Sequence, residues 1–434
     1  MKMKISCTPC SSLRPVAVVA LALLASGCMV GPDYHRPLVH VSATYAELPG
    51  WTQAEPDAAG PKGDWWTAFN DPLIDQLEPL VSVSNQTVRQ DYANYQEALA
   101  EVRVARAGLF PTVGVTGSAT RERSSSVETR STALSATRVA NSASLEGNVS
   151  WQLDVWGQVR RLIEENAATA QASEATLANA TLSEQVALAT AIIQLRVSDA
   201  NIDLLQKTVQ AYQHFLDVIA DQDKAGTIPP SDVISARTQL ETAQSSLIAL
   251  GVARAQFAHA IAVLVGKNPE ELSIAHSTTM PTQPTVPVGV PSTLLERRPD
   301  IANAERQMAA QNAAIGVAVS AYYPSISLSA LDGFTQSPLS GLLHVANYVW
   351  SLGASASETI FDGGLRSADV DAAKAAYDAT VANYRGTVLT AFEGVENDLS
   401  GLRILAEQST VLNSAVRDAT RGAEIAFNEY QAGT

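Results

Sequence analysis

Six histidines and a few acidic clusters are the side chains of this sequence that could do chemistry, and their spacing does not fit a catalytic or metal site. The histidines are scattered along the chain, at His35, His40, His214, His259, His276 and His344. Metal-binding motifs that can be recognised in a sequence place their ligands at short, regular spacings. We find no G-x-S-x-G, H-E-x-x-H or P-loop pattern. The sequence therefore predicts no catalytic residue, no metal ligand and no cofactor.

Two other features suggest chemistry only weakly. Gly266-Lys267 is followed by Asn and lacks the upstream glycine of a phosphate-binding loop. Glu164-Glu165 lies on a helical stretch, where an acidic pair is typical of a solvated face.

Cys28 is the one thiol with a clear chemical context. Lys2, Lys4 and Arg14 precede a short apolar run, residues 16–24, which is followed by Ala25-Ser26-Gly27-Cys28. This order is typical of a bacterial secretory signal, and the run is too short to span a bilayer as a helix. The small residues before Cys28 resemble the lipobox of bacterial lipoproteins. The resemblance implies cleavage after Gly27 and lipidation of Cys28, while Met29 in place of Asp favours the outer membrane. The alternative is an ordinary signal peptide with a chance cysteine.

Cysteine content and charge agree with that compartment. Cys7 and Cys10 lie in the segment that would be removed, so no internal disulfide could form in the remaining chain. The full sequence has 29 basic and 44 acidic residues, a net charge of −15, and loss of Lys2, Lys4 and Arg14 makes it −18. Such an acidic chain is a poor nucleic-acid binder. The charge fits either solubility in the periplasm or a tunnel wall that disfavours anions.

The strands and helices predicted from the sequence occur twice along the chain. Leu109-Phe110-Pro111 corresponds to Tyr322-Tyr323-Pro324, and the passage around Gly157 corresponds to that around Gly363. Gly157 precedes Gly226 by 69 positions, and Gly363 precedes Gly433 by 70. This spacing indicates an internal duplication of a strand pair followed by a long helix.

Four segments alternate between apolar and polar residues with the period of a β-strand. They are residues 112–120, 144–154, 325–331 and 350–357. Such alternation is typical of barrel strands with one lipid face and one wet face, although a soluble sheet with one buried face shows it too. Trp151 and Trp350 fall on the apolar faces, where aromatic residues often mark the membrane interface or simply pack in the sheet. Four strands cannot close a transmembrane barrel, so several chains would have to share one.

Residues 158–225 contain neither glycine nor proline and predict a helix of roughly 100 Å. Its expected apolar stripe comprises Leu182, Val186, Ala189, Ile193, Val197, Ala200, Leu204, Ala211, Phe215 and Ile219, with Thr208 as the polar member. Partner helices must cover this stripe, because a free helix of this kind is marginal. A return helix from Asp232 to Val265, capped by Ser231 or Asp232, would follow the turn at Gly226. The second run, 365–432, has four glycines and is expected to be less regular.

Four segments resemble the lipoprotein outer-membrane factors of Gram-negative tripartite efflux systems, the TolC/OprM/NodT type. They are Gly31-Pro32-Asp33-Tyr34-His35-Arg36-Pro37, Asp64-Trp65-Trp66-Thr67-Ala68-Phe69-Asn70-Asp71-Pro72, Leu153-Asp154-Val155-Trp156-Gly157-Gln158-Val159-Arg160, and Leu294-Leu295-Glu296-Arg297-Arg298-Pro299-Asp300-Ile301 with Ala304-Glu305 and Ile315-Gly316. The resemblance covers residues 28–434.

The resemblance implies an α+β fold in which a trimer shares one outer-membrane β-barrel, four strands per chain, above a long α-helical periplasmic barrel. It implies a passive exit duct without enzymatic activity, fed by an inner-membrane efflux pump through a periplasmic adaptor protein. It also implies a gating link at the periplasmic tip between Asp232 and Tyr430. The alternatives are a lipid-anchored periplasmic adaptor, which would carry a lipoyl-like β module, and a non-functional fragment of an exit duct.

The expected organisation has five parts. Residues 1–27 form the signal peptide; 28–90 hold the lipid anchor, an extended lead and a first helix; 91–266 form the first repeat; 267–299 are an extended connector; and 300–434 form the second repeat. Because the second copy stops at Thr434, we expect its return helix to be missing and the tip to close incompletely.

Overall fold

The computed structural model describes all residues except 1–28, 37–62, 124–138, 285–297, 337–340 and 433–434. The chain divides into two compact units. The sheet unit comprises Met1–Pro37, Glu97–Gln171 and Glu305–Asn383, and the hairpin unit comprises Leu38–Gln96, Ala172–Ala304 and Tyr384–Thr434. The five-part division expected above stays a prediction.

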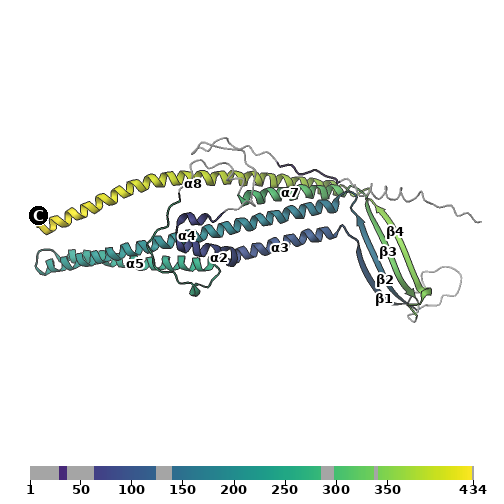
Figure 1. The fold of residues 1–434 in the computed structure, drawn as a ribbon, viewed down its shortest axis with the longest axis horizontal. Coiled ribbons are helices and arrows are strands. Elements are labelled where there is room, and N and C mark those ends of the chain that lie inside the picture. The colour runs from purple at the N-terminus through teal and green to yellow at the C-terminus, as the bar shows by residue number, and fades with distance from the viewer. Residues whose placement is uncertain (1–28, 37–62, 124–138, 285–297, 337–340, 433–434) are drawn as a thin grey trace, which may run out of the picture. The chain divides into compact units, whose positions relative to one another are not determined.

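Each repeat consists of a helix, two strands and a long helix (Figure 1). The first contains α3 (Gln86–Ala107), β1 (Thr112–Arg123), β2 (Val139–Leu153) and α4 (Gln158–Lys224). The second contains α7 (Pro299–Ser320), β3 (Ser325–Gln336), β4 (Tyr348–Ser357) and α8 (Leu365–Ala432). The shorter elements are η1 (Trp65–Phe69), α2 (Pro72–Ser84), α5 (Pro230–Leu264), η2 (Pro269–Glu271) and η3 (Val345–Asn347).

The four strands form one antiparallel sheet in the order β1-β2-β3-β4, so that the two repeats meet at the β2–β3 pair. The strands are longer than their alternation predicted. Arg121 pairs with Asn141 and Arg123 with Val139, which extends the first hairpin beyond the predicted segments 112–120 and 144–154. Backbone pairing continues past the apolar residues because the ladder bonds do not depend on side-chain polarity.

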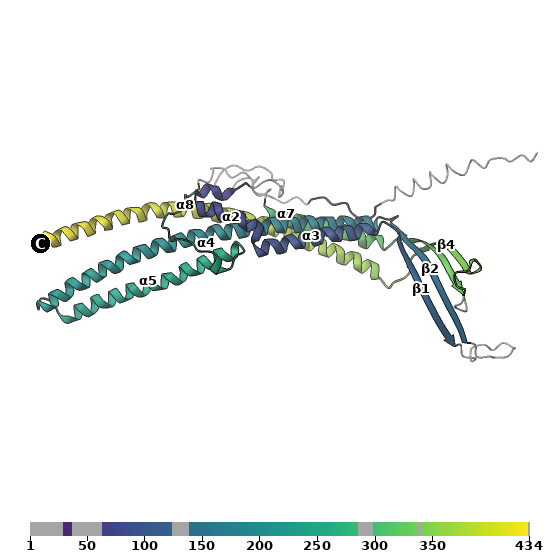
Figure 2. The ribbon, with the colours of Figure 1, turned by 60° about the horizontal axis from the view of Figure 1, so that its bottom comes forward.

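The hairpin of α4 and α5 turns at Gly226, and the two helices run side by side (Figures 1 and 2). Gly226 has φ +72°, and the amides of Gly226 and Thr227 donate to the carbonyls of Asp223 and Gln222. This is a Schellman motif, in which a left-handed glycine ends the helix. Gly266 ends α5 in the same way, with Lys267 donating to the Ala262 carbonyl, so the Gly-Lys step is a helix end.

The start of α5 differs from the prediction. Pro230 occupies the first helical position after Pro229, and neither Ser231 nor Asp232 caps the helix. A proline fits there because its missing N–H would be unpaired anyway. On length and composition alone, α5 is the one helix of the described residues that could cross a membrane. It instead buries Ala236, Leu240, Ala243, Ile261 and Ala262, and its last turn packs against α4 in the core of the hairpin unit.

That core forms where α2 meets η1, the start of α3, the middle of α4 and the end of α5. It contains Trp66, Ile74, Leu77, Val81, Val88, Leu188, Ala191, Ile192, Leu195, Ile261 and Val265. Asp71 caps α2 by accepting bonds from the amides of Leu73 and Ile74. Asn85 ends α2, caps α3 and donates to the Leu264 carbonyl, which ties the α2–α3 corner to α5.

The most deeply buried residues of α4 lie beside the predicted stripe, of which Ala189 is also buried. Leu188, Ile192 and Leu195 are fully buried, whereas Val186, Leu204 and Phe215 are 47%, 62% and 48% exposed. The helix therefore has two apolar faces, and the chain covers only one of them. Periodicity identifies both faces but does not say which partner each one meets.

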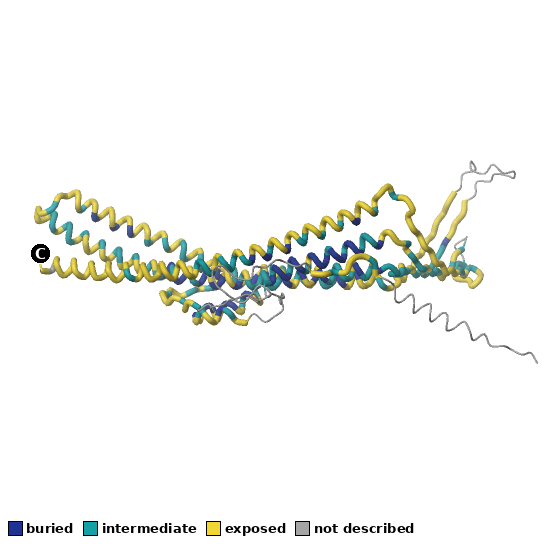
Figure 3. Tube along the Cα trace, turned by 90° about the horizontal axis from the view of Figure 1, so that it is seen from above, coloured by how far each residue is buried: buried dark blue, intermediate teal, exposed yellow. Residues whose placement is uncertain are grey.

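The second long helix is also more regular than expected, because α8 is continuous through Gly386, Gly394, Gly401 and Gly422. Its last part, from residue 402, is exposed along most of its length (Figure 3). The exposed residues include Leu405, Leu412 and Val416.

Candidate membrane sheet and helical groove

One face of the sheet is mostly apolar across all four strands, with Arg121, Arg123 and Asp332 as charged members. The strand register places Val113, Val115, Leu145, Val149, Trp151, Leu328, Ala330, Phe334, Tyr348, Trp350 and Leu352 on it. Val113, Val115 and Leu352 are each 76% exposed in the single chain. Water-exposed apolar area of this extent is unusual for a soluble protein and fits a surface that contacts lipid.

The opposite face carries hydroxyl and amide groups. Its residues include Thr116, Ser118, Thr120, Ser142, Ser144, Asn148, Ser327, Ser329 and Ser355. Cross-strand hydroxyl pairs join Ser118 to Ser144 at 2.9 Å, Thr120 to Ser142 at 2.5 Å, and Ser327 to Ser355 at 2.8 Å. A face of small hydroxyl side chains fits the wall of a wet lumen.

The two predicted interface tryptophans lie at different heights of the sheet, because the register places Trp350 level with Gly147 in the middle of β2. Trp151 is close to the end of β2 that leads into α4, and its indole donates to the Leu109 carbonyl at 3.0 Å. Trp350 is near the start of β4 and is 65% exposed. Their role at a membrane interface stays a prediction.

Further aromatic residues accompany both tryptophans, and the sequence analysis missed them. Near Trp350, the rings of Phe334 and Tyr348 meet edge to face at 5.8 Å. At the end of the sheet that leads into α4, Trp156 stacks on Tyr323 at 4.8 Å and donates to the Pro324 carbonyl at 2.8 Å. For the Trp156 stack, the available signal was the aromatic-Pro step Tyr323-Pro324, which recurs as Phe110-Pro111.

Both strand-to-helix passages use a carboxylate–arginine pair. Asp154 accepts bonds from the amides of Val159 and Arg160 and pairs with the Arg160 guanidinium at 3.0 Å. Asp362 pairs with Arg366 at 2.5 Å and accepts a bond from the Gly364 amide. The Arg366 hydrogen bond, followed by the Gly364 amide, lowers the pKa of Asp362 below its usual value. Each carboxylate therefore fixes the start of its long helix.

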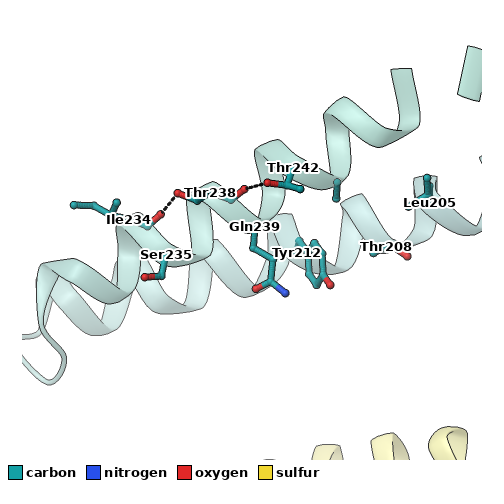
Figure 4. Close-up of a pocket in the computed structure, with 9 residues that line it drawn as sticks. Leu205, Thr208, Tyr212, Ile234, Ser235, Thr238, Gln239 and Thr242 are labelled. Atoms are coloured by element: carbon teal, nitrogen blue, oxygen red, sulfur yellow. Dashed lines mark hydrogen bonds between the residues drawn. The ribbon is translucent and has the colours of Figure 1, made fainter. Parts of the chain in front are cut away.

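A groove runs between α4 and α5 in the hairpin unit (Figure 4). Its volume is about 630 Å³, and its lining is formed by Leu205, Thr208, Tyr212, Ile234, Ser235, Thr238, Gln239, Thr242 and Ala243. A second hollow of about 430 Å³ between the same helices is lined by residues that include Asn201, Leu204 and Leu250. The α5 side of the groove is lined by the small hydroxyl residues Ser235, Thr238 and Thr242, which leave room for another helix to approach.

The predicted tip residues are not joined in the single chain. Asp232 lies in the first turn of α5, where its carboxylate meets the Ser231 hydroxyl at 3.4 Å. Tyr430 is two residues from the end of α8 and is 64% exposed. No hydrogen bond between these two residues occurs within the described chain, and their link stays a prediction. Cys28 lies outside the described residues.

The structure shows where the histidines and the Glu164-Glu165 pair lie and what they contact. His276 contacts Asp199 at 3.1 Å and Asp203 at 2.9 Å, while His35, His214, His259 and His344 are exposed and His40 lies outside the described residues. Glu164, expected on a solvated face, is 39% exposed and pairs with buried Arg161 at 2.8 Å. Burial raises the pKa of the neighbouring Glu165. Within the described ranges no group of three potential metal ligands occurs.

The family model for outer membrane efflux proteins matches residues 79–267 and 290–434 of this chain. This chain belongs to that family. The probable efflux pump outer membrane protein TtgC of Pseudomonas putida is 30% identical over 424 residues, which are 97% of this chain and 87% of the relative. Nodulation protein T of Rhizobium leguminosarum bv. trifolii is 29% identical over 419 residues, 95% of this chain and 87% of the relative.

Solved structures agree with the family assignment. The outer-membrane channel OprN is 31% identical, with a TM-score of 0.81 over 94% of this chain and 90% of the other. The CmeC channel of Campylobacter jejuni shares the fold, with a TM-score of 0.84 at 22% identity over 94% of this chain and 86% of the other. The chain is therefore an efflux protein of the Gram-negative outer membrane whose helical part lies in the periplasm.

Proposed function

We propose that three copies of this chain close one twelve-stranded barrel and form a passive exit duct without enzymatic activity. The observation that carries the proposal is the sheet itself, which has one apolar face, one hydroxyl face and two edge strands. In the described chain, β1 and β4 each pair on one side only. Unpaired backbone groups cannot face lipid, so each edge needs a partner strand in the membrane. Copies of the same sheet supply that partner if β4 of one pairs with β1 of the next.

The uncovered helix faces support the same assembly. Val186, Leu204 and Phe215 on α4, and Leu405 and Leu412 on α8, are exposed apolar residues in the single chain. Neighbouring copies in a helical barrel would cover them. Burial of apolar area stabilises such contacts by about 25 cal/mol per Å².

Cysteine crosslinking tests the shared barrel. Thr116→Cys on β1 is combined in turn with cysteine at residues 349, 351, 353 and 355 of β4, and oxidised outer membranes are separated without reducing agent. At least one pair should give covalent trimers. The matched control is cysteine at Asn148, which already pairs with Gly114 inside the sheet and cannot reach another copy's β4. Native trimers without a crosslink from any pair would contradict the strand order.

We also propose that Cys28 carries lipid and that the chain works with an adaptor and an inner-membrane pump. TtgC is named for an efflux pump, which supports this assignment. Labelled fatty acid should enter the wild type and not Cys28→Ala. Label in the mutant would exclude Cys28 as the lipid site.

The groove between α4 and α5 is the surface we propose for the adaptor. Thr238→Trp would fill it, whereas Gln244→Trp changes an exposed residue of the same helix outside the groove. The first substitution should reduce efflux and adaptor crosslinking while trimers persist, and the second should leave both near wild type. Equal effects of the two would argue against docking at this groove.

A further inference from the structure

Residues 29–36, which we call the strap, lie between Cys28 and the undescribed lead, and their contacts are unusually specific for an extended segment. The Val30 amide donates to the Trp156 carbonyl at 3.1 Å. The Asn312 side-chain amide donates to the Pro32 carbonyl at 3.0 Å, and the Tyr34 hydroxyl donates to Glu305 at 2.6 Å. The strap therefore contacts the first passage and α7 of the second repeat within one sheet unit.

Arg161 on α4 is the central group of these contacts. Its side chain is 1% exposed, and its guanidinium donates to the Val30 carbonyl at 3.1 Å, the Gly31 carbonyl at 3.2 Å and Asp33 at 2.9 Å. The remaining nitrogen pairs with Glu164. Burial disfavours the charge, but the hydrogen bonds to Asp33 and Glu164 outweigh it and raise the pKa of Arg161. A buried guanidinium with this many acceptors is a fixed structural element.

Glycines make room for this arrangement. A Cβ on Gly31 would lie 2.4 Å from the Gly316 Cα, and Gly31 has φ +92°. A Cβ on Gly316 would lie 2.8 Å from the Arg161 side chain. Gly157 has φ +82°, and a Cβ there would lie 2.7 Å from Met29. Side chains at these positions would push the strap away from α4 and α7.

The duplication shows that these residues are specialised for the strap. In the second passage Ser367 follows Arg366, so the second repeat has no counterpart of Arg161. Counted back from Pro324 and Pro111, Gly316 corresponds to Arg103 and Asn312 to Leu99. If Arg161, Gly316 and Asn312 served the repeat itself, both copies would carry similar residues at these positions. The strap occurs once, so it contacts α4 in the first repeat and α7 in the second.

We propose that the strap is a clasp that fastens α4 of the first repeat to α7 of the second at the base of the sheet, with Arg161 as its positioning residue. The clasp also holds Met29, the residue bonded to Cys28, against Gly157. Lipid on Cys28 would therefore be tethered at the strand-to-helix passage, and this second consequence rests on the proposed lipidation.

Hydrogen exchange of the full-length protein in detergent tests the clasp. Arg161→Gln and Gly31→Ala should each raise exchange of strap amides by about tenfold or more, because local opening exposes them. Arg160→Gln and Gly63→Ala are the matched controls. Arg160 pairs with Asp154 in the same passage, and Gly63 has φ +65° with no neighbour within 4 Å of an added Cβ. The controls should leave strap exchange at the wild-type rate.

The clasp and the tethering of lipid at the strand-to-helix passage can be disproved independently of each other. Unchanged strap exchange in Arg161→Gln and Gly31→Ala, or equal increases in the controls, would overturn the clasp. If Arg161→Gln does not fold, Gly31→Ala decides by the same measurement. Cys28→Ala should retain strap protection, since the clasp uses no lipid, and loss of protection in that variant would also overturn it. Absence of fatty-acid label from the wild type would remove only the tethering consequence.

Discussion

At the residue scale, the charged groups of this chain hold segments together. Arg161 binds the strap, Asp154 and Asp362 start the long helices, and Asp199 holds the connector to α4. Glu78 on α2 differs from them. It is fully buried in the hairpin unit, neither carboxylate oxygen has a hydrogen-bond partner within the described chain, and burial raises its pKa to about 8.

Glu78 should make the stability of the protein depend on pH. Its folded-state pKa of about 8 exceeds the ordinary value of 4.5, so the folded state holds the proton more tightly. The contribution of protonated Glu78 to the free energy of unfolding is fully present below pH 4.5, and it is lost as the pH rises through 8. Glu78→Gln should flatten that dependence and raise stability at pH 8 by about 1–3 kcal/mol. Thermal unfolding in detergent between pH 5 and 9 measures it, and parallel curves for both proteins would contradict it.

At the element scale, the hairpin of α4 and α5 is fastened to the connector after η2. Asp199 is 0% exposed and accepts bonds from Arg254 at 2.5 Å and from the Ser277 amide at 2.9 Å. Arg254 also donates to the Ile274 carbonyl at 3.2 Å. These bonds satisfy a buried carboxylate and hold an extended segment that has few bonds of its own.

Asp199→Ala should therefore destabilise the hairpin unit by about 3–5 kcal/mol, because it leaves Arg254 without its buried partner. Asp221→Ala is the control, since it removes an exposed pair with Lys224, and it should cost less than about 1 kcal/mol. Denaturant unfolding of both variants in detergent gives the two values. Similar losses would show that the Asp199 bonds are no stronger than a surface ion pair.

At the scale of the whole molecule, the two faces of the sheet decide where the chain can reside. Leu352 lies on the apolar face and its neighbour Ser351 on the hydroxyl face. The same arginine should have different effects at these two positions. On the lipid face near the middle of a bilayer it costs about 2–4 kcal/mol, whereas in a wet lumen it meets water.

Leu352→Arg should reduce the amount of trimer in the outer membrane, and Ser351→Arg should insert normally but lower cation conductance. Membrane fractionation and single-channel recording in planar bilayers separate the two outcomes. If Ser351→Arg blocked insertion and Leu352→Arg did not, the faces would be reversed.

Much of this architecture could be predicted from local patterns. Alternation identified all four strands and assigned Trp151 and Trp350 to the apolar face, because side chains of a strand point alternately to its two sides. The absence of glycine and proline predicted α4, and glycine spacing revealed the duplication. These features depend on backbone geometry within a few residues, so the sequence alone determined them.

Contacts between distant segments were decided only by the tertiary structure. The strap bonds join residues 131 and 280 positions apart, and no local period indicates them. The stripe predicted on α4 is only partly covered within the single chain, because helical periodicity shows apolar faces but not which partners cover them. Glu164 pairs locally with Arg161, but only the folded chain brings the strap against Arg161 and buries that guanidinium. Burial of a charge depends on which segments surround it, and that arrangement is a property of the whole fold.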